Sequence, residues 1–308
     1  MAKPSTYATA QKLFLATLVK MLFDYNEFVK ASRNWNKYAN AESVNWNESG
    51  GGTKSRRNGT RGAAARRNDV KRSYDVHEFK TDPTILHWVE EIVTNYAKRQ
   101  SILEEHVEQV AEDIAMYALW RWAKSSSGIV IETTGDTKKG IDGTDACAVT
   151  PDEFFDAQTK MDEEKVPDDG TRVALVPAHM MGDLRKYKEF HSRDRYPGMV
   201  LATGAIGKIA GFNIMKRSKT ILYDAAGEPI EFKANGSADE HTVVAGDSRT
   251  ISLWHPKFVT RAVSKHSVVK IIDTHEGLEL STTTIASGDV LYQNGRGFAT
   301  IREKKKVA

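Results

Sequence analysis

The chain has 308 residues, of which 40% are hydrophobic and 28% charged, a composition typical of globular proteins and not of disordered or membrane-spanning ones. Its 44 basic and 41 acidic residues give a net charge of +3. Its single cysteine, Cys147, excludes an intrachain disulfide framework and any zinc site built from several thiolates.

The N-terminal residues 10–30 place apolar side chains among charged ones at roughly helical spacing, which predicts an amphipathic helix that needs a partner surface. Charges at Lys20, Asp24 and Glu27 interrupt its most apolar part, so the pattern favours neither a signal peptide nor a membrane-spanning helix. We therefore expect no membrane partner and a cytoplasm-like compartment. Residues up to about 48 are predicted to be coil.

Residues 49–72 are rich in glycine and arginine and show no apolar periodicity. Between Lys54 and Arg72 there are eight basic residues and one acidic residue, a local charge of +7, which leaves the rest of the chain at −4. Such a segment buries too little surface to fold alone. Its cations are the candidate contact residues: Lys54, Arg56, Arg57, Arg61, Arg66, Arg67, Lys71 and Arg72.

Three interpretations of this basic segment stay open. Its cations can neutralise nucleic-acid phosphates, although no aromatic residue between Gly50 and Ser73 is available for base stacking. It can be a solvated linker. The interpretation that we favour is a loop that docks on an acidic surface of a neighbouring copy of the same chain. The C-terminal tail, Arg302–Lys306, adds a further +3 and is predicted to be a second basic extension of a body with a charge of −7.

After the basic segment, residues 73–80 are predicted to form a short strand, and Asp82-Pro83 has the composition of a helix start. Apolar residues at helical spacing then predict a helix as far as about Lys124, with a possible break at residues 98–100. Its second half, some 25 residues, would be roughly 37 Å long. This is the strongest periodic signal in the chain.

The remaining sequence predicts a mixed α+β fold. The expected elements are a loop over residues 133–145, a helix from the capping sequence Thr150–Glu153 to about Glu164, a turn at 167–170, a strand at 172–176, a helix from Pro177 to about residue 190, and short strands from Met199 onward.

No motif of enzyme chemistry is found. The glycines of TGAIGKIAGF (residues 203–212) match neither dinucleotide nor phosphate-loop spacing, and tight turns explain them better. The nine histidines form no metal-binding signature, and Cys147 has no basic neighbour in the sequence that would activate its thiol. We therefore predict no catalytic, cofactor-binding or metal-binding residues, no cofactor, and no enzymatic activity.

The order of these elements resembles the major capsid protein of tailed bacteriophages, which has the Hong Kong 97-like fold. The local resemblance is best in DDGTRVALVPAHMMGDLRKYKEF and GMVLATGAIGKIAGFNIMKRS, between Asp168 and Ser218. TPDEFFDAQTKMDEEKVP precedes them, and SLWHPKFVTRAV follows, as in the family pattern. Some relatives form covalent Lys–Asn links between subunits, but no residues of this chain are assigned to such a link.

The resemblance implies five parts. These are an N-terminal arm (residues 1–45), an extended loop (46–82), a peripheral domain with a long spine helix (83–149), an axial domain (150–258) and a return to the peripheral domain (259–308). It also implies oligomeric interfaces at which four aromatic residues could serve: Trp120, Trp122, Phe154 and Phe155.

The function implied is that of a major capsid protein. It would self-assemble into hexamers and pentamers of an icosahedral phage head that encloses double-stranded DNA, in a virion assembled in the host cytoplasm. Expected partners are further copies of the chain, scaffold, portal and decoration proteins, and packaged DNA through non-specific contact. Two alternatives stay open: an encapsulin-like protein compartment, and a nucleic-acid-binding protein that acts through the arginine-rich segment.

Overall fold

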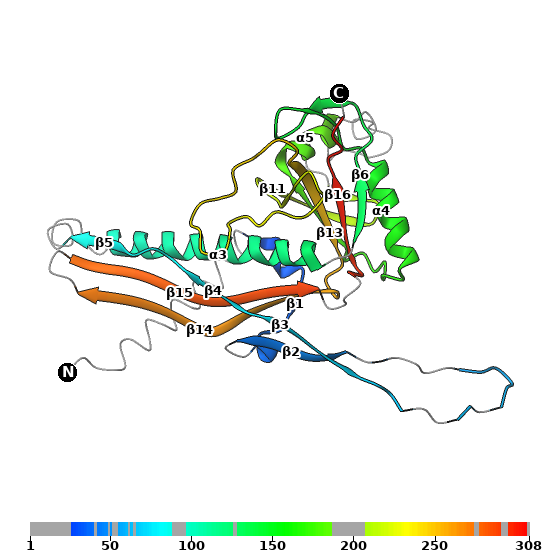
Figure 1. Ribbon diagram of the computed structural model, residues 1–308, viewed down its shortest axis with the longest axis horizontal. Helices are drawn as coiled ribbons and strands as arrows, with labels where there is room; N and C mark the ends of the chain where they lie inside the picture. The colour runs from blue at the N-terminus through cyan, green and yellow to red at the C-terminus, as the bar shows by residue number, and fades with distance from the viewer. Residues whose placement is uncertain are drawn as a thin grey trace.

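The computed structural model describes residues 26–39, 42–48, 50, 55–60, 62–63, 66–87, 97–125, 128–186, 207–273, 277–290 and 295–306. Most of the predicted N-terminal helix lies outside these residues. The described chain mixes helices and strands, which confirms the α+β prediction. It forms an elongated lobe, a compact lobe above one end of it, and a ribbon that extends away from both (Figure 1).

The elongated lobe consists of a long helix that lies along a five-stranded sheet (Figure 1). Its elements are α3 (Ala97–Ser125), β1 (Arg33–Asn34), β14 (Val259–Asp273), β15 (Gly277–Val290), β4 (His77–Lys80) and β5 (Thr84–His87). Strands β14 and β15 form a long antiparallel hairpin, paired from Val259↔Val290 to Asp273↔Leu278. Short 3₁₀ helices at Glu27–Lys30 and Asn36–Tyr38 flank β1.

Helix α3 forms because its apolar residues recur at intervals of three and four, so that they line one face. Val107, Val110, Ile114 and Trp122 are all buried against the sheet. The helix approaches β15 at Gly288, where an added Cβ would lie 2.7 Å from the backbone oxygen of Thr260 and 3.2 Å from Ala118 Cβ. Only glycine fits this approach, which lets the helix bury its full apolar stripe. The predicted helix end near Lys124 is confirmed.

The compact lobe is built on a seven-stranded mixed sheet covered by two helices (Figure 1). Its strands are β6 (Ile129–Glu132), β9 (Val173–Pro177), β10 (Lys208–Ile209), β11 (Phe212–Arg217), β12 (Leu222–Tyr223), β13 (Ser248–Trp254) and β16 (Phe298–Arg302). Its helices are α4 (Asp152–Glu163) and α5 (Ala178–Lys186), and a separate hairpin joins β7 (Thr137–Lys139) to β8 (Asp145–Cys147).

Local chemistry in the compact lobe follows the sequence closely. The backbone N–H and hydroxyl of Thr150 both donate to the Glu153 carboxylate, at 2.6 Å, where the capping sequence predicts the start of a helix. Ala210 and Gly211 have φ angles of 45° and 78° and form a two-residue turn between β10 and β11. The prediction that the glycines of this segment serve tight turns is therefore confirmed at Gly211.

The ribbon consists of β2 (Ser43–Glu48) and β3 (Val70–Asp75), paired antiparallel from Ser43↔Asp75 to Glu48↔Val70. The described residues between them continue the ribbon away from both lobes (Figure 1). The prediction of coil up to residue 48 is wrong at β2. Val44 becomes a strand residue because it is buried with Tyr74 and Ala262, residues distant from it in the sequence.

Two further expectations need correction. Thr84–His87, predicted as the start of a helix, is strand β5, because Leu86 is buried against Leu280 of β15. Residues 133–145, predicted as a loop, include β7 and the first residue of β8. The structure also places β6 and β16 in the same sheet as β9 and β13, which makes the compact lobe larger than residues 150–258.

Candidate functional site

The ribbon carries the sequence-predicted contact residues. Lys54 and Arg61 lie outside the described residues. Of the other six, Lys71 and Arg72 lie on β3, and the rest lie in the segment between β2 and β3. Arg72 Nε lies 2.8 Å from Glu48 Oε2 across the ribbon, and Arg67 Nη2 lies 2.6 Å from Asp69 Oδ2. These two arginines are therefore neutralised within the chain. The hydrogen bond from Arg67 also lowers the pKa of the Asp69 carboxyl below its usual value.

Four ribbon cations are available to a partner: Arg56, Arg57, Arg66 and Lys71. All four are exposed, and none makes an ion pair with a described residue. Arg56 Nη1 donates to the backbone oxygen of Thr60 at 3.1 Å, which leaves its charge uncompensated. Because long exposed side chains bind weakly one by one, the ribbon acts as a contact surface only if several cations are engaged together.

The C-terminal tail is not a free basic extension, and this prediction is wrong. Arg302 and Lys304 both pair with Glu132, at 2.9 and 3.1 Å, and Lys305 Nζ lies 2.6 Å from Asp142 Oδ1. The backbone of the tail is held as well, since Cys147 N–H donates to the Lys304 oxygen. The acids that hold the tail lie more than 160 residues earlier in the chain. The charge asymmetry inferred from the sequence is therefore a property of the ribbon.

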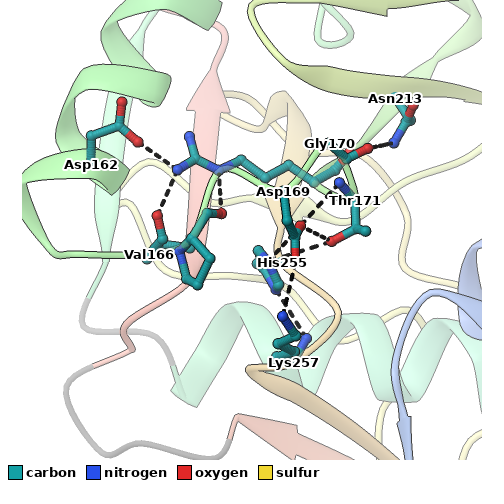
Figure 2. A network of polar contacts seen from close by, with 10 residues as sticks. Asp162, Val166, Asp169, Gly170, Thr171, Asn213, His255 and Lys257 are labelled. Atoms are coloured by element: carbon teal, nitrogen blue, oxygen red, sulfur yellow. Dashed lines mark hydrogen bonds and ion pairs between the residues drawn. The ribbon is translucent and has the colours of Figure 1, made fainter.

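A polar network lies where the chain passes from the compact to the elongated lobe (Figure 2). At its centre is Arg172, whose side chain is fully buried. Its guanidinium donates to the backbone oxygens of Val166 and Pro167, at 2.7 and 3.1 Å, and to Asp162 Oδ1 at 2.5 Å. These bonds hold the end of α4 and the following turn against the residue that directly precedes β9.

The second half of the network joins the turn to the chain between β13 and β14 (Figure 2). His255 is fully buried, and its Nε2 lies 3.2 Å from Asp169 Oδ1. Lys257 contributes its backbone N–H to His255 Nδ1 at 3.1 Å and its ammonium to Asp169 Oδ2 at 2.9 Å. Since Nδ1 accepts, the neutral ring carries its proton on Nε2 and donates it to Asp169.

Electrostatics agree with this assignment. Burial lowers the pKa of His255 below its usual value, and the nearby Asp169 carboxylate only partly opposes this. Hydrogen bonds from Thr171 and Lys257 lower the pKa of Asp169. A neutral imidazole and an ionised carboxylate are therefore the forms present near neutral pH, and together they fix the junction between the two lobes.

Thr171, His255 and Asp169 have the composition of a nucleophile–base–acid triad but not its geometry. A triad places the acid and the nucleophile at opposite ring nitrogens. Here Thr171 Oγ1, at 3.4 Å, and Asp169 both lie at Nε2. The Thr171 hydroxyl also donates to Asp169 at 2.5 Å, so its proton is directed away from the base. The three residues stabilise the junction and do not form a nucleophilic site.

Other sites in the described chain give no catalytic arrangement. No group of three or more His, Cys, Asp or Glu side chains converges there as a metal site would. A cavity of about 400 Å³ lies beside Met116 of α3, and the ion pair Lys219–Glu240 lies at its wall. No helix among the described residues is both long and apolar enough to cross a membrane.

Comparison with known proteins gives a result only at the level of structure. No protein-family model and no curated protein matches the sequence. The capsid of the cyanophage P-SCSP1u is 13% identical, with a TM-score of 0.63, and the match covers 90% of this chain and 87% of that one. The mature capsid of bacteriophage PhiM1 is 11% identical, with a TM-score of 0.62 and coverage of 88% and 85%.

The holo-SrpI encapsulin complex from Synechococcus elongatus PCC 7942 also matches, with 13% identity, a TM-score of 0.54 and coverage of 89% and 86%. The chain has the Hong Kong 97-like capsid fold. The resemblance read from the sequence is confirmed for the fold.

Within this capsid fold, three of the four aromatic residues expected at interfaces belong to the interior. Trp120, Trp122 and Phe154 are buried in the cores of the two lobes. Phe155, in contrast, is 53% exposed on α4. Two successive residues on a helix point in different directions. Once the helix bounds are known, the helical period therefore shows that Phe154 and Phe155 cannot both face the core.

An aromatic cluster that the sequence did not predict lies at the base of the ribbon. Trp35, Tyr38, Trp46 and Tyr74 pack edge to face, with ring centroids 5.1 to 5.6 Å apart. Trp46 lies directly opposite Arg72 in the ribbon register. Only the alternation of Val44 and Trp46 with polar residues hinted at this strand, and the partner strand is more than 20 residues away along the chain.

Proposed function

We propose that the chain is the repeating subunit of a closed icosahedral shell, the major capsid protein of a tailed phage, which assembles in the host cytoplasm and encloses double-stranded DNA in the virion. The observation that carries this proposal is a capsid fold that presents a ribbon with four exposed cations, none of which makes an ion pair with a described residue. The compact lobe takes the role of the axial domain, and the elongated lobe takes that of the peripheral domain. Residues 46–82 are the extended loop, and residues 1–45 the arm.

The basic ribbon binds an adjacent subunit in this proposal. Outside the segment Lys54–Arg72 the chain has a net charge of −4, so each copy attracts the ribbon of the next. Exposed cations stay hydrated in an isolated subunit, so they destabilise it little. When acidic groups of a neighbouring copy surround them, the electrostatic attraction stabilises the contact. Because these contacts lie at the surface, assembly weakens as salt screens them, with a Debye length of about 10 Å at 0.1 M.

The first experiment expresses the full chain, alone and with scaffold and portal proteins of a phage encoding it, and images the product by electron microscopy. We expect closed particles with hexameric and pentameric units. If only monomers or small dimers form under all these conditions, the proposal is wrong.

The second experiment separates the three interpretations of the ribbon. The variant Arg56→Ser, Arg57→Ser, Arg66→Ser removes three unpaired ribbon cations. A matched control, Lys160→Ser, Lys208→Ser, Lys216→Ser, removes three exposed cations from the compact lobe. Loss of particles in the ribbon variant alone supports docking on a neighbour. Intact particles with lost nucleic-acid binding favour the nucleic-acid interpretation, and no effect on either property favours a solvated linker.

A protein compartment of the encapsulin type is the second candidate, because the SrpI encapsulin complex shares the fold. The content of purified particles distinguishes the two. Nuclease-protected double-stranded DNA supports a phage head, whereas a co-purified protein cargo without DNA supports a compartment.

A further inference from the structure

The base of the ribbon forms a surface pocket of about 440 Å³. The aromatic pocket, as we call it, is lined by Arg33, Trp35, Tyr38, Asn45, Trp46, Asn47 and Lys71. Its rings come from two elements, the 3₁₀ helix Asn36–Tyr38 with the residue before it, and strand β2. Trp35 packs against Tyr38 and Trp46 at centroid distances of 5.3 and 5.1 Å, so the rings hold one another in place.

The charges at the aromatic pocket are all positive. Arg33 and Lys71 are exposed and make no ion pair with any described residue. Lys37 lies over the Tyr38 ring, with its Nζ 4.6 Å from the centroid, and adds a third cation at the rim. The lining includes no carboxylate, and the ribbon carboxylate of Glu48 is paired with Arg72. The surface therefore favours a partner that combines an apolar group with negative charge.

Its composition is that of a protein interface centre. Tryptophan, tyrosine and arginine are the residues most enriched where a few side chains carry most of the binding energy. Tyr38 remains 42% exposed in the isolated subunit, so apolar ring surface is left for a partner to cover. Two-fold pairing of the pocket with itself would bring Arg33 and Lys71 against their own copies. The contact must therefore join the pocket to a different surface of the next copy, which is the arrangement that produces rings.

A complementary surface lies on α4. Phe155 is 53% exposed there, on the face opposite Phe154, Ala157 and Met161, which are buried. Asp152 and Asp156 flank Phe155, one turn before it and directly after it, and both are exposed. Neither aspartate forms an ion pair with a described residue, whereas Asp162 near the end of the same helix is paired with Arg172. We call Phe155, Asp152 and Asp156 the acidic knob.

We propose that the acidic knob of one copy inserts into the aromatic pocket of a neighbouring copy, with Phe155 against the rings and its two aspartates beside Arg33 and Lys71. The inference rests on the proposed function, because it names a contact within the proposed shell. A volume of about 440 Å³ admits one phenyl side chain, since pockets of roughly 300–1,000 Å³ hold whole small molecules. Aromatic insertion supplies the apolar contact, and the charges select which surfaces meet.

Charge exchange in the full-length chain tests the pairing. The pocket variant is Arg33→Glu with Lys71→Glu, and the knob variant is Asp152→Lys with Asp156→Lys. We expect each variant to raise the subunit concentration needed for particles by at least about tenfold, and the two combined in one chain to restore assembly. Phe155→Ser should weaken assembly without lowering subunit stability, because the side chain is exposed. Asp136→Lys with Asp239→Lys, two exposed acids outside the extended loop and the acidic knob, is the matched control.

The outcomes separate this inference from the proposed function. If the unmodified chain forms no particles, the proposed function itself fails. If particles form and neither the pocket variant, the knob variant nor Phe155→Ser changes the assembly concentration relative to the control, the pairing is wrong. It is also wrong if the combined variant assembles no better than each single one. If the pocket variant loses bound nucleic acid and assembles normally, the pocket binds nucleic acid and the pairing is rejected.

Discussion

Replacement of Arg172 by methionine should destabilise the subunit strongly, although the residue lies in no catalytic or ligand site. The guanidinium is fully buried and donates to the backbone oxygens of Val166 and Pro167. Methionine replaces the aliphatic part of the side chain, but it ends short of the guanidinium position and leaves both oxygens without their donor. The contact with Asp162 matters less, because that side chain is 51% exposed and water replaces the lost partner.

The magnitude follows from these contacts. A hydrogen bond to a charged group contributes about 1.5–3 kcal/mol, and two of them are lost. Methionine also removes a buried charge, one of whose nitrogens, Nη1, has no hydrogen-bond partner. Because burying that charge is unfavourable, its removal offsets part of the lost stability. We expect a net decrease in the free energy of unfolding of about 2–4 kcal/mol. The stability of Arg172→Lys should lie between that of the unmodified chain and that of Arg172→Met, because a lysine side chain is too short for its ammonium to reach both oxygens.

The assay is urea unfolding of dispersed subunits, at a concentration where light scattering shows no particles, followed by tryptophan fluorescence. Arg66→Met is the matched control, because Arg66 is exposed on the ribbon without an ion pair among the described residues, and its stability should equal that of the unmodified chain. If Arg172→Met unfolds at the same urea concentration as Arg66→Met, then the buried guanidinium does not hold the turn and the reasoning fails.

Three more predictions test the lobes and their junction. Gly288→Ala should lower stability by about 1–3 kcal/mol in urea unfolding, because its Cβ would overlap the backbone oxygen of Thr260 on β14. Unchanged stability would mean that the backbone of β14 shifts freely. The pKa of His255 is lowered by burial, so the unfolded chain takes up the proton first. Stability should therefore fall as the pH drops below about 6.5, and His255→Gln should reduce this slope in unfolding measured from pH 7.5 to 5. Lys305→Ala should lower the free energy of unfolding by about 3 kcal/mol, because it leaves the Asp142 carboxylate, whose side chain is 1% exposed, without its cation. The same substitution at the exposed Lys306 should lower it little. Although burial raises the pKa of Asp142, the hydrogen bonds from Lys305 and Gly246 lower it overall, so in Lys305→Ala acid unfolding should begin at a higher pH.

Elements with a local signal could be predicted from the sequence. Helix α3 has an apolar residue at every third or fourth position, and α4 begins at its capping sequence, so periodicity and capping chemistry define both without tertiary contacts. The turn at Ala210–Gly211 likewise follows from backbone freedom at glycine. In each case the residues that determine the element lie within it.

The errors fall where a distant partner determines the structure. Asp82-Pro83 has the chemistry of a helix start, yet the following residues pair with β15, about 190 positions away in the chain, because Leu86 and Leu280 bury each other. Residues 43–48 read as coil because two apolar residues in six are a weak strand signal. They become a strand by pairing with β3. The aromatic pocket depends on that pairing and could not be found before it.

Charge is the clearest case of this dependence. Summing charges along the chain treats the ribbon and the tail alike, as two basic segments on an acidic body. The structure separates them, because Glu132 and Asp142 meet the tail lysines, while four cations of the ribbon meet no described acid. A segment with a positive net charge can bind an acidic partner only where the fold leaves its basic side chains without ion pairs. By that criterion Lys71 belongs both to the ribbon cations that meet no described acid and to the lining of the aromatic pocket, so a partner that engages both must present several acids.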